Sequence, residues 1–305
     1  MLLKKKEEIE NWLNHYNIKN YELIPDEKYD YVVNVNGKVY LKDKKLKNIK
    51  VKFNEINGDF DCSYNQLESL EGCPEIVKNT FDLRNNNLKK LIYSPKKVGN
   101  FYCEYNQLES LDGCTEVIEG DFFCCYNLLI SFKGGPKLIK GNLDCSDNKL
   151  RSLEFAPEIN KDFYCDNNEL ITLKGCQKVI NGNFNCNNNK LISLKFGPEE
   201  VKGYFSCSRN ELTTLKYISK SIESSLNCDN NNISSIHELK YIKKIKGERI
   251  ILNQNEKLGN IQNINDFKEL KIVINDILKI NKEKKYLLKN LNKEKLNKNI
   301  NINKI

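Results

Sequence analysis

A tandem repeat constrains this chain more than any other feature of its sequence. "FDCSYNQLESLEGC" begins at Phe60, and nearly the same words, "FYCEYNQLESLDGC", begin at Phe101. We call the first residue of each copy its origin and each copy a rung. Successive origins are 20 or 21 residues apart and fall at Val39, Phe60, Phe81, Phe101, Phe122, Leu143, Phe163, Phe184, Phe205 and Leu226. A looser eleventh copy begins at Ile250. A fixed period of this length predicts a solenoid, in which each rung stacks on the next.

The columns of the aligned repeat predict a core and a ladder. Two residues after the origin, eight rungs carry cysteine: Cys62, Cys103, Cys124, Cys145, Cys165, Cys186, Cys207 and Cys228. Because alternate residues of a strand share a face, origin and cysteine point the same way, and we expect these thiols to be reduced core residues. Five residues after the origin, ten rungs carry asparagine, from Asn65 to Asn255, and the first carries Lys44. The amide groups predict a hydrogen-bonded ladder along the stack.

The pattern F-x-C-x-x-N-x-L-x-S-L-x-G-x-P, read from Phe60 to Pro74, resembles the leucine-rich repeat L-x-L-x-x-N-x-L in the short form of bacterial and phage proteins. This resemblance implies a leucine-rich repeat solenoid: a curved array of short parallel strands whose concave side binds other proteins. The chain departs from the family pattern by preferring Phe and Cys to Leu. Its connecting segments are too short for helices and carry prolines such as Pro95, so we expect an extended or turn-like back.

We divide the chain into three parts. Residues 37–258 form the solenoid, and residues 1–36 form an N-terminal helical cap and a lead-in strand, because Ile9, Trp12, Leu13 and Tyr16 have helical spacing. Residues 259–305 form a C-terminal helical cap and a Lys-rich tail. The apolar stripe of this cap consists of Phe267, Leu270, Ile274, Ile277 and Leu278. Beyond the stripe, a second helix and a frayed tail remain alternatives.

The outward positions of the strands carry the candidate binding site. They combine aromatic with acidic residues. The simplest explanation of the acidic residues is that they keep the sheet surface solvated. Exposed aromatics on neighbouring rungs, however, are typical of binding hot spots. We therefore predict a partner-binding face with the aromatic residues Tyr64, Tyr102, Tyr105, Phe123, Tyr126, Tyr164 and Tyr204. Its acidic residues are Asp59, Asp61, Asp82, Asp121, Asp144 and Asp162.

Other chemistry finds little support in the sequence. His15 and His237 lie near opposite ends of the array, so neither can serve a cysteine or serine nucleophile in its middle. The column cysteines are spread along an axis, whereas zinc ligands converge on one point. We expect no enzyme activity, no metal and no cofactor. Cys125 lies outside the core column and is expected to point out of the sheet.

The distribution of charge indicates which class of partner the face can bind. The net charge is +8, but residues 256–305 alone hold 12 lysines against 6 acidic residues. A concave face rich in aspartate repels phosphate, so we expect a partner protein with a basic surface rather than nucleic acid. The predicted function is a protein-protein interaction module, an inhibitor or adaptor that could block a nucleic-acid-processing enzyme. Alternatives are an assembly component using its edges and C-terminal helices, and nucleic-acid binding through the Lys-rich back and tail. With no long apolar run, we expect a cytoplasmic protein without a membrane partner.

Overall fold

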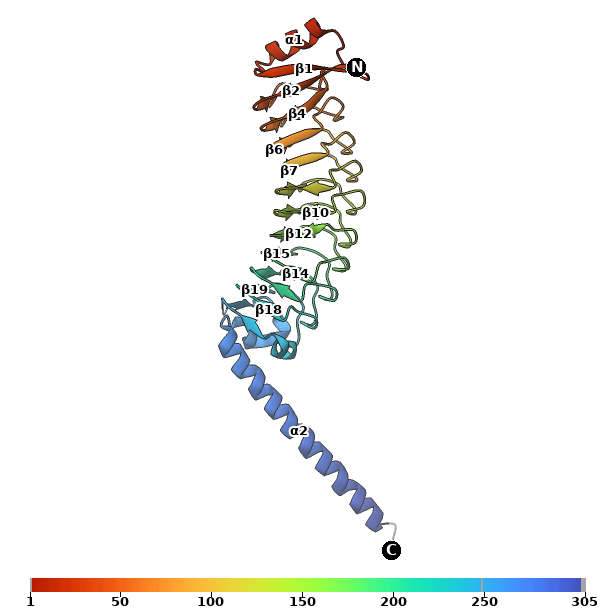
Figure 1. Ribbon diagram of the computed structural model, residues 1–305. Helices are drawn as coiled ribbons and strands as arrows, with labels where there is room; N and C mark the ends of the chain where they lie inside the picture. Colours follow the sequence, from red (N-terminus) through yellow and green to blue (C-terminus); the bar gives the residue numbers. More distant parts are fainter. Residues whose placement is uncertain (1, 248, 303–305) are drawn as a thin grey trace.

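The computed structural model describes residues 2–247 and 249–302. The chain winds into one stack of rungs, with short strands along one side and irregular loops along the other (Figure 1). We call the strand side the concave face and the loop side the back. The fold therefore has the predicted architecture, a solenoid with parallel strands.

Each rung contributes one or two short strands. The strands that contain the origins are β3 (Val39–Tyr40), β5 (Phe60–Asp61), β9 (Phe122–Phe123), β11 (Leu143–Asp144), β13 (Phe163–Tyr164), β15 (Phe184–Asn185), β17 (Phe205–Ser206), β19 (Leu226–Asn227) and β21 (Ile250–Ile251). A second set precedes the origins: β4 (Phe53–Ile56), β8 (Val117–Ile118), β10 (Leu138–Ile139), β12 (Glu158–Ile159), β14 (Val179–Ile180), β16 (Glu200–Val201), β18 (Ser221–Ile222) and β20 (Lys244–Ile245). In two rungs both merge, as β6 (Ile76–Asp82) and β7 (Lys97–Tyr102).

The parallel register aligns every origin with the next. Phe60 pairs with Phe81, Phe81 with Phe101 and Phe101 with Phe122. The phenylalanine rings consequently pack against one another in the core, with centroids 5.2 Å apart and 56° between the ring planes for Phe81 and Phe101. All eight column cysteines are fully buried beside them, which confirms their predicted place in the core.

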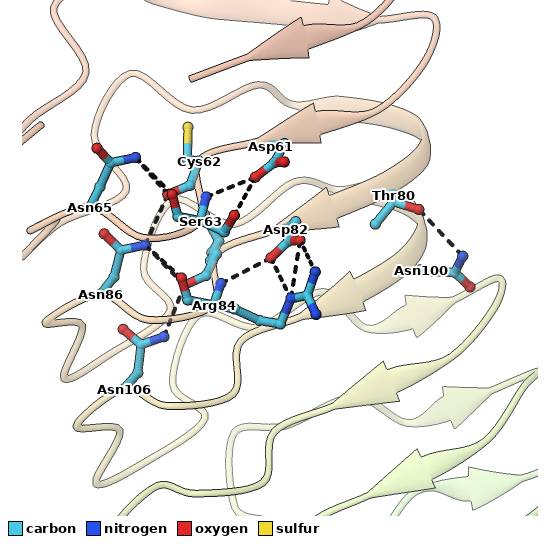
Figure 2. Close-up of polar contacts among 11 residues, drawn as sticks. Asp61, Cys62, Ser63, Asn65, Thr80, Asp82, Arg84, Asn86, Asn100 and Asn106 are labelled. Atoms are coloured by element: carbon cyan, nitrogen blue, oxygen red, sulfur yellow. Dashed lines mark hydrogen bonds and ion pairs between the residues drawn. The ribbon is translucent and has the colours of Figure 1, made fainter. Parts of the chain in front are cut away.

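The asparagine ladder is also confirmed. The side-chain amide of Asn86 donates to the carbonyl of Cys62 in the preceding rung and to that of Leu83 in its own, both at 3.0 Å. Its Oδ1 accepts from the backbone N–H of Leu67 at 2.9 Å. Asn65 and Asn106 lie directly before and after it in Figure 2. Each asparagine thus ties two rungs together through buried backbone groups that would otherwise lack partners.

The N-terminal end of the core is covered by α1 (Lys6–His15), whose Ile9 and Leu13 are buried. An antiparallel hairpin of β1 (Tyr21–Asp26) and β2 (Asp30–Val35) follows, and β2 pairs in parallel with β4. The sequence predicted only one strand here. β1 carries Pro25, a residue that weakens a strand prediction but is tolerated at the edge of a sheet.

At the other end, two 3₁₀ helices, η1 (His237–Tyr241) and η2 (Glu256–Asn263), lead to α2 (Phe267–Ile302). Phe267, Leu270 and Ile274 are buried against the solenoid, Ile277 is half-buried, and the side chain of Leu278 lies outside the described residues. α2 then continues as one helix that projects away from the stack, in place of the second helix or frayed tail (Figure 1). Among the described residues, no helix is apolar enough over a sufficient length to cross a bilayer.

Candidate partner-binding face

The backbone of each rung presents several outward positions on the concave face. The origin and the residue two places later point into the core, so the residue between them points outward. The strand then ends in a turn, and the fourth residue after the origin takes a left-handed conformation, with φ of 56° at Tyr64, 55° at Tyr105 and 54° at Tyr126. All three tyrosines are about half exposed. The turn thereby displays a large side chain at the rim of the sheet.

Two pairs of aromatic rings stack between neighbouring rungs. The centroids of Tyr102 and Phe123 are 5.1 Å apart, with 19° between the ring planes. Those of Tyr105 and Tyr126 are 4.4 Å apart, with 7° between the planes. Aromatic residues that the sequence places on neighbouring rungs thus come into ring contact within each pair. Stacking holds these side chains in place before any partner arrives, which lowers the entropy cost of binding.

The other predicted aromatics lie apart from these stacks. Between Tyr64 and Tyr105 lies a rung that carries Asn85 at the same position. The ammonium group of Lys42 lies 5.0 Å from the ring centroid of Tyr64. Tyr164 and Tyr204 are half-buried, and burial is the main cause that raises the pKa of both phenols. The Tyr164 hydroxyl donates to Asp162 at 2.8 Å. These two tyrosines are held within the sheet surface.

The acidic residues just before the origins have a structural task that the sequence did not reveal. Asp121 accepts the backbone N–H of Asn142 in the next rung at 2.8 Å, and Asp162 accepts that of Asn183 at 2.6 Å. Asp59 forms an ion pair with Lys38 at 2.8 Å. The strands around most origins are only two residues long, so these side chains extend the hydrogen bonding between rungs beyond the strand.

The aspartates just after the origins close the turn. Asp61 and Asp144 each accept from a serine two residues later, through both its N–H and its hydroxyl group, as drawn for Asp61 in Figure 2. Asp82 is only 5% exposed, and Arg84 holds both of its carboxylate oxygens. The prediction that Asp82 belongs to an exposed acidic rim is therefore wrong, because this carboxylate is buried and neutralised.

Two residues beside the stacks behave differently from expectation. Cys125 was predicted to point away from the sheet, but it is only 8% exposed, and burial strongly raises the pKa of its thiol. Its electrostatic neighbours are Asp144 and Glu104, so it lies on the concave face yet is covered by adjacent rungs. Glu104 was missed. Burial raises its carboxyl pKa to about 7, and its Oε2 has no hydrogen-bond partner among the described residues.

The reactive groups near this face are few among the described residues. Within residues 2–247 and 249–302, no three His, Cys, Asp or Glu side chains are grouped closely enough to hold a metal ion. Burial raises the pKa of the core thiols, for example those of Cys62 and Cys165, and a protonated thiol is a poor nucleophile. What the face offers a partner is stacked rings surrounded by carboxylates.

Comparison with known proteins adds little to this geometry. No curated protein matches the chain. A family model described as gag gene protein p17 (matrix protein) matches residues 82–121, far less than half of the chain. Among solved structures, YopM from Yersinia enterocolitica WA-314 is similar at 19% sequence identity and a TM-score of 0.39, over 72% of this chain and 55% of that chain. A likeness at this level carries no argument about function.

The class of fold rests on the molecule itself. Rungs of 20 or 21 residues stack with their parallel strands in register, and an asparagine ladder joins consecutive rungs. These features define a solenoid of stacked parallel strands whose repeat resembles the leucine-rich repeat.

Proposed function

We propose that this solenoid is a non-catalytic inhibitor or adaptor that binds a basic protein partner through its concave face. The observation that carries the proposal is the pair of aromatic stacks in the middle of the array: the half-buried rings of Tyr102 and Phe123, and the exposed rings of Tyr105 and Tyr126. Ordered aromatic groups of this kind form the energetic centre of protein interfaces.

Charge on the same face supports a basic partner. In the rungs from Phe60 to Phe163, we consider the residues one before and one, three and four after each origin. Arg84 is the single basic residue among them, against nine acidic ones: Asp59, Asp61, Asp82, Glu104, Asp121, Asp144, Asp147, Asp162 and Asp166. Arg84 neutralises Asp82, and burial raises the carboxyl pKa of Glu104 to about 7, but the remaining carboxylates give a summed field that attracts cations and repels phosphate.

Such a module would act simply by binding its partner. By covering a basic groove, it could block an enzyme that processes nucleic acid, and by holding two proteins together it could act as an adaptor. A cytoplasmic setting fits the twelve free thiols, because a reducing compartment keeps them from forming disulfides.

The test first isolates the partner by affinity capture on the unchanged chain and then compares variants of the full chain for their affinity toward it. Tyr102→Ala and Phe123→Ala should each weaken binding by about 2 kcal/mol, roughly 30-fold. Asp147→Asn removes one charge at a turn position where other rungs already carry asparagine, and should chiefly slow association and reduce its salt dependence. Ile171→Ser, on the back, is the control. Full affinity in the two aromatic variants would refute the proposal.

A second candidate function is assembly through α2. The projecting helix exposes Ile280, Tyr286, Leu287 and Leu288, and exposed apolar groups of this size favour association. Light scattering of the full chain at increasing concentration tests it, since a constant monomeric mass would exclude self-association through this helix.

A further inference from the structure

A second row of aromatic residues lies on the back of the solenoid, in a column that the sequence analysis did not single out. In the eight rungs from Phe60 to Phe205, the residue twelve places after the origin always has positive φ, between 65° and 97°. Four rungs place glycine there: Gly72, Gly113, Gly134 and Gly175. The other four place an aromatic residue: Tyr93, Phe155, Phe196 and Tyr217.

Aromatic residues are poorly suited to this backbone conformation. Positive φ is strained for a bulky side chain, whereas glycine adopts it freely. Burial does not offset the strain, because Phe155 is 69% exposed and Phe196, Tyr217 and Tyr93 are at least half exposed. Folding stability alone therefore favours glycine at all eight positions. An exposed residue kept in a strained conformation indicates a contact outside the chain.

Exposed isoleucines accompany the aromatics. Ile130, Ile171 and Ile192, each eight residues after an origin, are about 60% exposed or more. Ile192 and Phe196 belong to one loop, in which Leu191 and Leu194 turn inward and are buried. We name the exposed aromatic residues and isoleucines of these two columns between Ile130 and Tyr217 the back ridge. It consists of Ile130, Phe155, Ile171, Ile192, Phe196 and Tyr217.

The back ridge is basic, in contrast to the concave face. Lys195 and Lys216 each directly precede a ridge aromatic, and their ammonium groups lie 4.9 and 5.1 Å from the ring centroids. Neither lysine has a carboxylate within ion-pair distance in the described part of the chain, whereas Lys174 pairs with Glu154 at 2.8 Å. Positive charge is thus available beside the exposed rings, where an anionic surface could meet it.

In contrast to the expectation from the sequence of no membrane partner, we propose that the back ridge docks on the surface of an anionic lipid bilayer. Its rings and isoleucines would enter the boundary between headgroups and acyl chains, while Lys195 and Lys216 would contact lipid phosphates. The isoleucines favour lipid over single-stranded nucleic acid, because an aliphatic side chain offers no ring for a base to stack on. A flat bilayer can also touch several rungs at once on the outer side of a curved stack. This inference is independent of the proposed function, since the concave face stays free for a protein.

The test is co-sedimentation of the full chain with vesicles, using phosphatidylcholine mixed with phosphatidylserine and phosphatidylcholine alone. We expect binding to the anionic vesicles that weakens with salt. Lys195→Ser and Lys216→Ser should each reduce it roughly fivefold. The double variant Phe196→Gly/Tyr217→Gly should reduce it at least tenfold, yet unfold at the same or a higher temperature, because glycine relieves the strain. Tyr102→Ala/Phe123→Ala, on the opposite face, should bind vesicles like the unchanged protein.

Three outcomes would overturn the proposal. The unchanged protein could fail to bind anionic vesicles. The double glycine variant could bind them undiminished, which would transfer the lipid contact to the lysines of α2. Alternatively, the chain could ignore vesicles and bind a single-stranded oligonucleotide through the ridge lysines, which would make the ridge a nucleic-acid surface.

Discussion

The asparagine ladder gives the sharpest test of how the rungs are held together. In the middle of the stack, Asn148 is buried; its amide donates to the carbonyls of Cys124 at 3.0 Å and Cys145 at 3.2 Å. Its Oδ1 accepts the N–H of Leu129 at 2.9 Å. Asn148→Ala removes these bonds and leaves buried backbone groups without partners. Each unpaired group costs about 1 to 3 kcal/mol, and partial relaxation is expected, so we predict a loss of about 2 to 4 kcal/mol of unfolding free energy.

Urea unfolding of the full chain measures the total effect, and amide hydrogen exchange locates it. The control is Asn160→Ala, whose exposed side chain lies on the same rung and should change stability by no more than about 0.5 kcal/mol. Because repeat arrays can unfold in parts, the amide of Leu129 should also lose protection in Asn148→Ala. Equal stability of the two variants, or unchanged protection at Leu129, would refute the role given to the ladder.

Three further predictions follow from buried and capping residues. Cys165→Ser should destabilise by about 1 to 3 kcal/mol and Cys165→Val by less, as measured by urea unfolding, since serine buries a hydroxyl whose one polar neighbour among the described residues is the Asn185 carbonyl, 3.3 Å from the present thiol. A chain ending at residue 277 keeps Phe267, Leu270 and Ile274 and should stay soluble, whereas one ending at residue 258 exposes the last strand and should aggregate; equal solubility would contradict the capping role of α2. The carboxyl pKa of Glu104 is about 7 in the folded chain, above the value near 4.3 expected in the unfolded chain. The stability that this carboxyl contributes is therefore fully present below about pH 4.3. It is lost as the pH rises through 7, by up to about 3 kcal/mol. Glu104→Gln should flatten the pH dependence of the urea midpoint, and an unchanged profile would contradict the buried carboxyl.

The solenoid was predictable because its information is periodic. Phe and Cys alternate at the period of a strand, and asparagine recurs at a fixed offset from the origin. Each aligned column therefore shows the same structural requirement about ten times. The core position of Cys165 and the ladder position of Asn148 follow from their columns alone. Even the ring stacks could be expected, since parallel strands in register place Tyr102 beside Phe123.

The features that could not be predicted from the sequence depend on contacts between neighbouring rungs. A pattern of columns does not say that most strands around the origins are two residues long, and hence that Asp121 must accept an N–H from the next rung. The burial of Cys125 and Glu104 depends on adjacent side chains, which vary from rung to rung. The back ridge was missed because glycine and aromatic residues share no property except, here, positive φ.

Site-specific photocrosslinking tests most directly whether the concave face binds the partner. A photoreactive phenylalanine analogue placed at Tyr105, within the exposed stack, should give one discrete adduct in cells that contain the partner, and the attached protein should be basic. The same group at Lys190, an exposed position on the back, should not give this adduct. Tyr102→Ala/Phe123→Ala in the Tyr105-labelled chain should abolish it. An adduct from Lys190 with none from Tyr105, or one that survives the double substitution, would contradict the assignment of partner binding to the concave aromatic face.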